Sequence, residues 1–164
     1  MPRSNNLAVH MKTAAEIMNA DVRSVSPEDD ARAAIDLLAE SELGAVPVVD
    51  ADRRVVGIVS ESDLILSDEE SDLHLPHYLN IMGGIVFVGS MKGFEKRLDK
   101  AFATKVSELM TADPVTAHDF EAADRVAKKI ADKHHNHLPV VDADGHLMGM
   151  VTRADALAAV VDDS

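Results

Sequence analysis

The hexapeptide PVVDAD occurs twice in this 164-residue chain, at 47–52 and again 92 positions later at 139–144. Shifting the chain on itself by that interval also aligns the flanking residues without a gap, so that Gly57 falls on Gly149. Roughly fifteen of about fifty aligned positions are identical, and the apolar pattern matches more closely still. The sequence therefore predicts two copies of one structural unit.

Within each copy the hydrophobic period changes in the same order. Apolar residues first recur at helical spacing, which predicts one amphipathic helix per copy. These residues are Ala31, Ala34, Ile35 and Leu38 in the first copy, and Ala123, Val126, Ala127 and Ile130 in the second. Short β-branched runs on either side of a turn then predict a β-hairpin, and a second helix is expected after it with Ser60 or Thr152 as the N-cap. Each copy thus reads strand, helix, strand, strand, helix.

Three segments follow from this alignment: a first repeat at 10–66, an insert at 67–103 and a second repeat at 104–162. One repeat of this size would be marginal alone, so the two are expected to share a core. The insert opens with the acidic run SDEESD and ends with Phe94, Leu98 and Phe102 at helical spacing. It is expected to cover the pair of repeats or to form a dimer contact, with a ligand lid as the alternative.

Composition excludes several classes of protein. A net charge of −13 argues against nucleic-acid binding, because affinity for a phosphate backbone comes largely from Lys and Arg. The longest nearly apolar stretch, at 81–89, is far shorter than the roughly twenty residues that a membrane helix needs. The chain has no cysteine, and its first residues do not resemble a signal peptide. We expect a cytoplasmic protein that binds neither membranes nor nucleic acid.

Catalytic motifs are not found. The chain has no nucleophile elbow, P-loop or dinucleotide-binding glycine pattern, so we predict that it is not an enzyme. Three histidines cluster at His134, His135 and His137, but no cysteine accompanies them and no His-x-x-x-His pair is present. We therefore predict no metal site, and we expect His74 and His77 in the insert to be solvated loop residues.

The strongest motif is a glycine, two apolar residues, Ser or Thr, two variable residues and Asp. It occurs as GIVSESD at 57–63 and as GMVTRAD at 149–155. With the EIM and ELM segments and the two PVVD strands, it resembles the cystathionine-β-synthase (CBS) domain family, whose members occur in tandem pairs. The resemblance covers both repeats, and the insert resembles that of many stand-alone prokaryotic pairs.

This resemblance implies an α/β (α+β) fold, in which two β-α-β-β-α repeats pack about a pseudo-two-fold axis. It also implies two clefts that bind an adenosine compound such as AMP, ADP, ATP or S-adenosylmethionine, with or without Mg²⁺, in a regulatory ligand-sensing module. A hydroxyl at a helix N-terminus suits a phosphate oxygen, and an Asp three residues later can accept hydrogen bonds from a ribose. The alternative is that Ser60 and Thr152 are plain N-caps in a structural dimerisation module with empty clefts.

The resemblance assigns residues to each cleft. The cleft expected to bind more strongly comprises Asp155, Thr152, His137, Met150, Asp29, Ala34, Leu43 and Gly44. The weaker cleft comprises Asp63, Ser60, Ile58, Glu121, Val126, His135 and Asn136. The ranking follows because His137 is expected to offer a cation where the first repeat has Ala45, and because Ala34 is smaller than Val126.

The chain departs from the family pattern at two positions. Family members often carry Thr where this chain has Asp29 and Glu121, and carboxylates there would repel phosphate unless Mg²⁺ or Arg153 intervened. A less charged ligand, such as adenosine or S-adenosylmethionine, is thereby favoured. Apolar residues of the insert and the segment at 156–161 predict a homodimer, because isologous pairing would bury them. The regulated protein is unknown.

Overall fold

The computed structural model describes residues 11–64, 78–81, 84–87 and 104–162. The first repeat contains α1 (Ala14–Ile17), α2 (Ala31–Glu40), β1 (Ala45–Val49), β2 (Val55–Ser60) and the short 3₁₀ helix η1 (Glu61–Leu64). The second contains α4 (Val106–Leu109), β5 (Thr111–Ala112), β6 (Ala117–His118), α5 (Ala123–Lys133), β7 (His137–Val141), β8 (Leu147–Thr152) and α6 (Arg153–Asp162). The strands form the mixed α/β architecture expected from the sequence, with two three-stranded sheets ordered β1-β2-β5 and β6-β7-β8.

The two repeats agree residue by residue. In the first hairpin Ala45 pairs with Ser60, and in the second His137 pairs with Thr152, which are the positions 92 residues further along. Both hairpins carry a register irregularity at the same place, between Val48 and Val49 and between the equivalent residues of β7. The duplication read from the sequence is therefore a duplication of structure, down to strand register.

Each repeat is completed by the segment that leads into the other one. β5, which opens the second repeat, pairs with β2 of the first, while Asn19 of the first repeat forms a bridge with Met150 on β8. The short helices α1 and α4 cross in the same way. The Ala14 N–H donates to the carbonyl of Glu121 at 2.8 Å, and the Val106 N–H donates to the carbonyl of Asp29 at 2.9 Å.

The buried side chains form two clusters that reflect this exchange. One lies on the second repeat, built from α5, α6, β7 and β8, and it includes the fully buried Ala14 of α1. The other lies on the first repeat and includes the fully buried Val106 of α4. The predicted helical stripes are confirmed, since Ala34 and Val126 are both 0% exposed. Each buried cluster therefore contains a side chain from the other repeat, which is the physical reason why the two repeats fold together.

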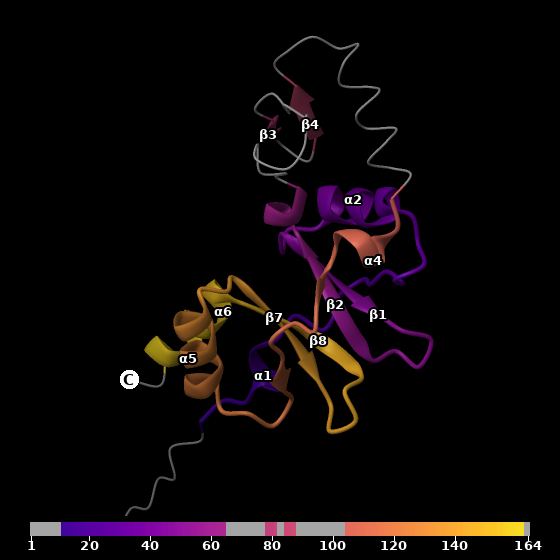
Figure 1. The fold of residues 1–164 in the computed structure, drawn as a ribbon. Coiled ribbons are helices and arrows are strands. Elements are labelled where there is room, and N and C mark those ends of the chain that lie inside the picture. The colour runs from indigo at the N-terminus through magenta and orange to yellow at the C-terminus, as the bar shows by residue number, and fades with distance from the viewer. Residues whose placement is uncertain (1–10, 65–77, 82–83, 88–103, 163–164) are drawn as a thin grey trace, which may run out of the picture.

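The hairpin tips meet on the pseudo-two-fold axis. Arg54 bridges to His146, its own equivalent 92 residues later, and the Val55 N–H donates to the Gly145 carbonyl at 3.1 Å. In Figure 1 both hairpins run toward the same lower side of the molecule, while α5 and α6 lie together on the left and α2 lies at the upper right. The repeats are thus joined at the crossed lead-in segments and at the hairpin tips.

The expected second helix is seen in only one of the repeats. It is present in repeat 2 as α6, whereas in repeat 1 the end of the motif lies in η1, and the residues after Leu64 lie outside the described part. Within the insert, β3 (Tyr78–Ile81) and β4 (Gly84–Phe87) form an antiparallel hairpin that the sequence did not predict. The helix expected at Phe94 to Phe102 lies outside the described residues. Among the helices that are described, none is long and apolar enough to cross a membrane.

Candidate functional site: the clefts between the repeats

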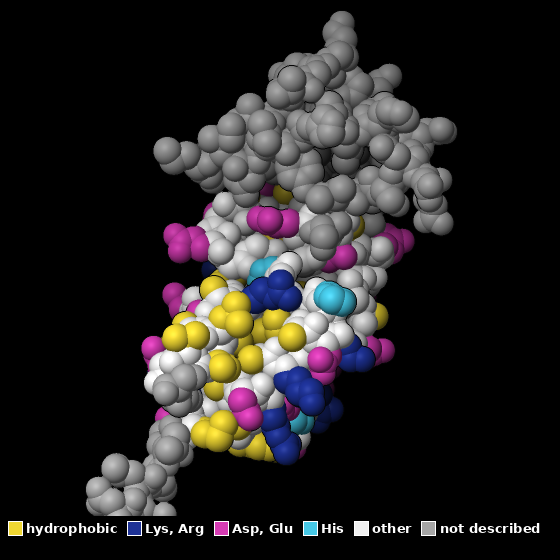
Figure 2. Space-filling view, turned by 90° about the vertical axis from the view of Figure 1, so that its left-hand side faces the viewer, with side chains coloured by type: hydrophobic (Ala, Val, Ile, Leu, Met, Phe, Trp, Pro, Cys, Tyr) yellow, Lys and Arg dark blue, Asp and Glu magenta, His cyan; other side chains and the backbone are white. Residues whose placement is uncertain are grey.

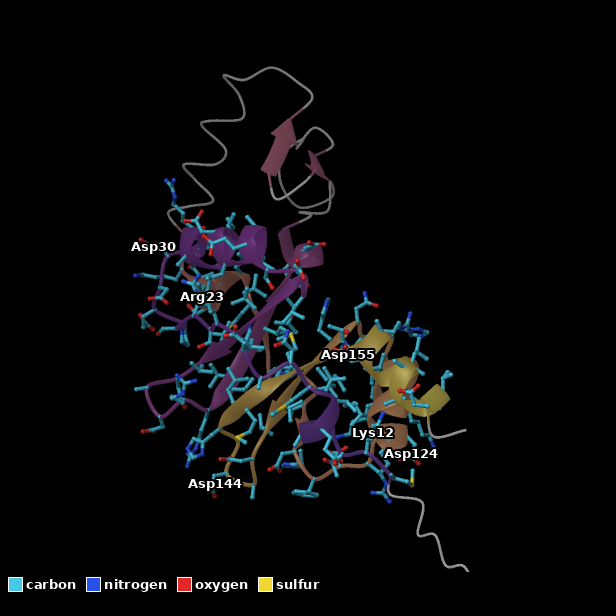
Figure 3. The ribbon with its side chains drawn as sticks, turned by 180° about the vertical axis from the view of Figure 1, so that it is seen from behind. Lys12, Arg23, Asp30, Asp124, Asp144 and Asp155 are labelled. Atoms are coloured by element: carbon cyan, nitrogen blue, oxygen red, sulfur yellow. The ribbon has the colours of Figure 1, made fainter. Side chains whose placement is uncertain are left out.

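The Ser/Thr-x-x-Asp motif has the same local geometry in both repeats. The Ser60 N–H and hydroxyl donate to Oδ2 of Asp63 at 2.7 and 3.0 Å, and those of Thr152 donate to Oδ2 of Asp155 at 3.0 and 2.8 Å. In each turn the carboxylate therefore accepts the N–H of the Ser or Thr, which is the reciprocal arm of a capping box. In the second motif the Asp155 N–H also donates to Oγ1 of Thr152 at 3.2 Å, as an N-cap requires. Figure 3 labels Asp155 at the start of α6. The capping role occupies one carboxylate oxygen of each Asp.

The surroundings of the two motifs differ. A cavity of about 500 Å³ opens at the first motif, and we call it the Asp63 cleft. Its walls come from β2 and η1 on one side and from the segments after β5 and after α5 on the other. The lining residues are Gly44, Ile58, Ser60, Glu61, Asp63, Thr111, Asp113, Pro114, Val115, His134, His135, Asn136 and His137. Both repeats thus contribute to one cleft.

Five residues expected together are brought together here: Ile58, Ser60, Asp63, His135 and Asn136 all line the Asp63 cleft. Gly44 and His137 also line it, although the sequence placed them in the opposite cleft. The reason is that β7 begins against the first repeat. A Cβ added at Gly44 would lie only 3.3 Å from Nε2 of His137, so the absence of a side chain there makes room for the imidazole.

Sequence reasoning missed six lining residues: Glu61, Thr111, Asp113, Pro114, Val115 and His134. The four from 111 to 115 reach the cleft because β5 pairs with β2, with Thr111 opposite Ile58. The Thr111 hydroxyl donates to Oδ1 of Asp63 at 3.3 Å. The only sequence signal was the position of these residues directly after the repeated ELM segment. The crossing that carries them to the other repeat leaves no local pattern.

A second cavity, of about 320 Å³, lies beside the end of α2 and the start of β1. It is lined by Asn19, Asp21, Val22, Arg23, Leu37, Glu40, Ser41, Glu42, Leu43, Ala45 and Val46. Leu43, expected in the Asp155 cleft, is among them. Thr152, Asp155 and Met150 line neither of these two cavities. Met150 is 0% exposed, and its N–H and carbonyl are both hydrogen-bonded to the backbone of Asn19.

The remaining expected residues lie elsewhere. Ala34 and Val126 belong to the two buried clusters, because the helical stripe that contains them faces the sheets. Asp29 and Glu121 occupy equivalent turns before α2 and α5, where the Asp29 carboxylate accepts the Ser26 N–H at 2.8 Å. None of these four residues lines the cavities described above. The size difference between Ala34 and Val126 therefore says nothing about cleft volume.

The side chain of Glu121 is held by a partly buried ion pair. Its Oε1 accepts a hydrogen bond from Nζ of Lys129 at 2.6 Å and another from the His118 N–H at 3.1 Å. Lys129 Nζ also donates to the Thr116 carbonyl at 3.0 Å. Burial would raise the pKa of Glu121, but the Lys129 hydrogen bond, the His118 N–H and the nearby positive charge outweigh it and lower the pKa.

Replacing Lys129 with methionine should lower the free energy of unfolding by about 1–2 kcal/mol at neutral pH. A depressed carboxylate pKa contributes stability above the pKa of the unfolded chain, and this contribution is lost as the pH falls through the folded pKa. The difference between wild type and Lys129→Met should therefore shrink between about pH 7 and about pH 3 in urea titrations. Lys128→Met, one residue away and exposed, is the control. An equal effect of both substitutions would contradict the role given to the pair.

His137 is a half-buried residue in the lining of the Asp63 cleft. Burial lowers the pKa of this imidazole, although a hydrogen bond with the Leu43 backbone and the negative charge of Glu61 act in the opposite direction. Burial therefore favours the neutral form of this ring, which counts against the cation that the sequence assigned to this position.

One group of side chains in the described part of the chain comes close enough to hold a metal ion, namely Asp142, Asp144 and His146. It lies on the β7–β8 turn, whose tip is marked by Asp144 in Figure 3. Asp142 accepts the N–H groups of Asp144 and His146 at 2.9 Å, and its other oxygen lies 3.0 Å from Nδ1 of His146. These contacts close the turn. The three histidines of the cleft do not form such a group.

Relatives of this chain are CBS-domain proteins. A protein of Methanocaldococcus jannaschii, MJ1426, is 30% identical over 142 residues, which cover 84% of each chain. CBSX1 of Arabidopsis thaliana, a chloroplastic CBS domain-containing protein, is 28% identical over 163 residues, 98% of this chain and 69% of that one. The inosine-5′-monophosphate dehydrogenase of Korarchaeum cryptofilum is 29% identical over 151 residues, but the match spans only 25% of its length.

Solved structures agree with the observed fold. CBSX2 of Arabidopsis thaliana in complex with AMP has a TM-score of 0.66 at 26% identity, and the match covers 92% of this chain and 97% of that one. A second structure of CBSX2 gives a TM-score of 0.70 at 25% identity, over 93% and 96% of the two chains. The CBS domain model itself matches residues 14–70 and 106–162, and these two matches contain the described elements of the two repeats. The chain therefore belongs to the CBS domain family, as a tandem pair.

Proposed function

We propose that this chain is a regulatory module that binds an adenosine compound in the Asp63 cleft. The observation that carries the proposal is the cavity itself, which places Asp63 and Ser60 opposite residues of the second repeat. The complex of CBSX2 with AMP supports the class of ligand. The reason for ranking the Asp155 cleft first was the presence of His137, and that residue lines the Asp63 cleft instead.

The lining suits a nucleoside in two ways. Oδ1 of Asp63 faces Thr111 at 3.3 Å and can exchange that contact for a ribose hydroxyl, while Oδ2 keeps the turn closed. Ile58, Pro114 and Val115 offer apolar surface against which a flat base can lie. One end of the cleft thus provides hydrogen-bond acceptors, and the wall beside it provides the apolar area that binding requires.

The same geometry suggests how binding acts on the protein. Asp63 belongs to the first repeat, whereas Asp113 and Val115 belong to the second, so a ligand contacts both. A ligand with different affinity for two arrangements of the repeats shifts the population toward the one it binds more tightly. We infer that the chain senses its ligand and changes the behaviour of a separate protein, rather than catalysing a reaction. The cytoplasmic location stays a prediction of the sequence.

Thermal unfolding in the presence of adenosine, AMP, ADP, ATP and S-adenosylmethionine tests the proposal. A ligand that binds only the folded state stabilises it by about 2.7 kcal/mol at a hundredfold excess over its dissociation constant. For a chain of this size that corresponds to a rise in melting temperature of about 5–10 °C. If millimolar concentrations of all five compounds leave the melting temperature unchanged, the structural dimerisation alternative gains the support that ligand sensing loses.

A homodimer is proposed for either function, because α6 presents apolar side chains to solvent. Leu157 is 56% exposed and Val161 is 72% exposed. Figure 2 looks onto the face formed by α5 and α6, where hydrophobic side chains gather beside a few charged ones. Isologous pairing across this face would bury them.

Sedimentation analysis should return twice the 17.6 kDa mass of one chain. The double substitution Leu157→Asp and Val161→Asp should shift the protein to monomers, since charges are costly to bury at an interface. The double substitution Ala51→Asp and Ala143→Asp, at exposed positions in the turns of the two hairpins rather than on α6, serves as a control for added charge. A wild-type monomer at tens of micromolar would defeat the proposal.

A further inference from the structure

The Asp63 cleft has an unusual charge inventory for a site expected to receive a phosphorylated ligand. Among the residues that the structure describes, its lining includes neither lysine nor arginine. The lining residues that carry charge or can acquire it are Glu61, Asp63, Asp113, His134, His135 and His137. With neutral imidazoles the cleft is therefore lined by carboxylates alone. A close carboxylate repels an anion by enough to weaken its binding roughly tenfold where water only partly screens the charges.

Three histidines of the lining can offset the negative charge of these carboxylates when they are protonated. His134 and His135 follow the last turn of α5, and His137 opens β7, so three imidazoles lie along one wall. They face carboxylates from two other segments, Glu61 and Asp63 of η1 and Asp113 after β5. Histidine is the side chain that changes charge in mildly acidic solution, so acidification adds positive charge to this wall.

The charged groups just outside the cleft do not change the balance. Arg153 starts α6, and its N–H donates to the Asn136 carbonyl at 2.9 Å, but its side chain is exposed and does not line the cavity. Glu42, on the segment between α2 and β1, lines the smaller cavity instead. The His137 ring lies against Leu43 and Gly44 of that same segment. In the described part of the chain, the histidines are therefore the lining residues that can supply positive charge to a bound anion.

We propose, on the basis of the proposed function, that the Asp63 cleft selects adenosine compounds by charge. At neutral pH it takes a nucleoside whose 5′ substituent is uncharged or positive, and it accepts an anionic 5′ group when its histidines are protonated. Binding of an anionic nucleotide is thus coupled to proton uptake. Adenosine itself gains nothing from protonation and binds alike across this range.

Calorimetry with adenosine and adenosine 5′-sulfate at about pH 6 and about pH 8 tests this coupling. The sulfate ester keeps a single negative charge over the range, whereas the phosphate of AMP would itself titrate. We expect adenosine to bind within about twofold at the two pH values, and the sulfate to bind at least about tenfold more weakly than adenosine at the higher pH. At the lower pH that gap should close to within about threefold.

Two variants separate the cleft from general pH effects. The triple substitution His134→Gln, His135→Gln and His137→Gln should keep the gap between the two ligands at both pH values. Asp113→Asn should narrow the gap at the higher pH by about threefold or more, since it removes one negative charge. Asparagine tolerates the left-handed backbone that Asp113 adopts (φ 48°), so this variant retains the fold.

The outcomes are distinguishable. If neither ligand binds at either pH, the proposed function fails. The charge selection is overturned, while the nucleoside site stands, if adenosine binds but the affinity for the sulfate is the same at both pH values. It is also overturned if the triple variant still shows a gap between the two ligands that closes on acidification.

Discussion

Replacing Asp63 with asparagine is expected to weaken adenosine binding by about ten- to a hundredfold. A carboxylate oxygen that accepts ribose hydroxyls takes part in charge-assisted hydrogen bonds, which contribute about 1.5–3 kcal/mol each. Asparagine has nearly the same size but offers a single acceptor oxygen, and the Ser60 N–H and hydroxyl already compete for it. Titration calorimetry of the wild type and Asp63→Asn with adenosine measures the loss.

Asp155→Asn is the matched control for this experiment. Asp155 caps its turn through the same two hydrogen bonds from Thr152, so both substitutions should lower the melting temperature by a similar amount. It lines neither of the two cavities, and its substitution should leave adenosine affinity within about twofold of wild type. If instead Asp155→Asn abolishes binding and Asp63→Asn does not, the ranking originally expected from the sequence is right and the Asp63 cleft is the wrong site.

Gly149→Ala is expected to cost about 3 kcal/mol of folding free energy and to lower the melting temperature by about 5–10 °C. A Cβ at this position would lie 2.6 Å from the Asn19 carbonyl oxygen and 2.7 Å from Sδ of Met18. The carbonyl belongs to the lead-in segment that is hydrogen-bonded to Met150, so it cannot move away without breaking that bridge. Alanine would otherwise favour the folded state by about 0.4–1 kcal/mol, which makes a loss diagnostic.

The equivalent substitution in the first repeat is predicted to cost less. A Cβ at Gly57 would collide with Met110, whose flexible side chain can shift, while the Thr111 carbonyl is 3.2 Å away. Thermal unfolding should place Gly57→Ala about 1–2 kcal/mol above Gly149→Ala in stability. In double-mutant cycles Met110→Ala should recover most of the cost at Gly57, whereas Met18→Ala should recover little at Gly149. Equal costs with equal recovery would mean that the two crossings are equivalent.

The helices and strands could be predicted from the sequence because they depend on the spacing of apolar residues along the chain. The stripes ending at Leu38 and Ile130 have the helical period, and both helices bury those faces. The two PVVD runs are β-branched and followed by turn residues, and both became the first strand of a hairpin with the same register. The two copies, which lie 92 residues apart, align without a gap and therefore have turns of equal length. Because register follows from turn length and side-chain alternation, the two hairpins share one register.

The site depended on contacts between repeats, and these follow no local period. Both lead-in segments look alike, so nothing in their residues says that Ala14 completes the core of the second repeat and Val106 that of the first. The same crossing brings Asp113 to Asp63 and turns His137 toward Gly44, so that all four residues line the cavity at the first motif. The order of residues along the chain determined the two units and their motifs. Only close packing between the units, where a missing side chain at Gly44 admits an imidazole, decided which residues line each cavity.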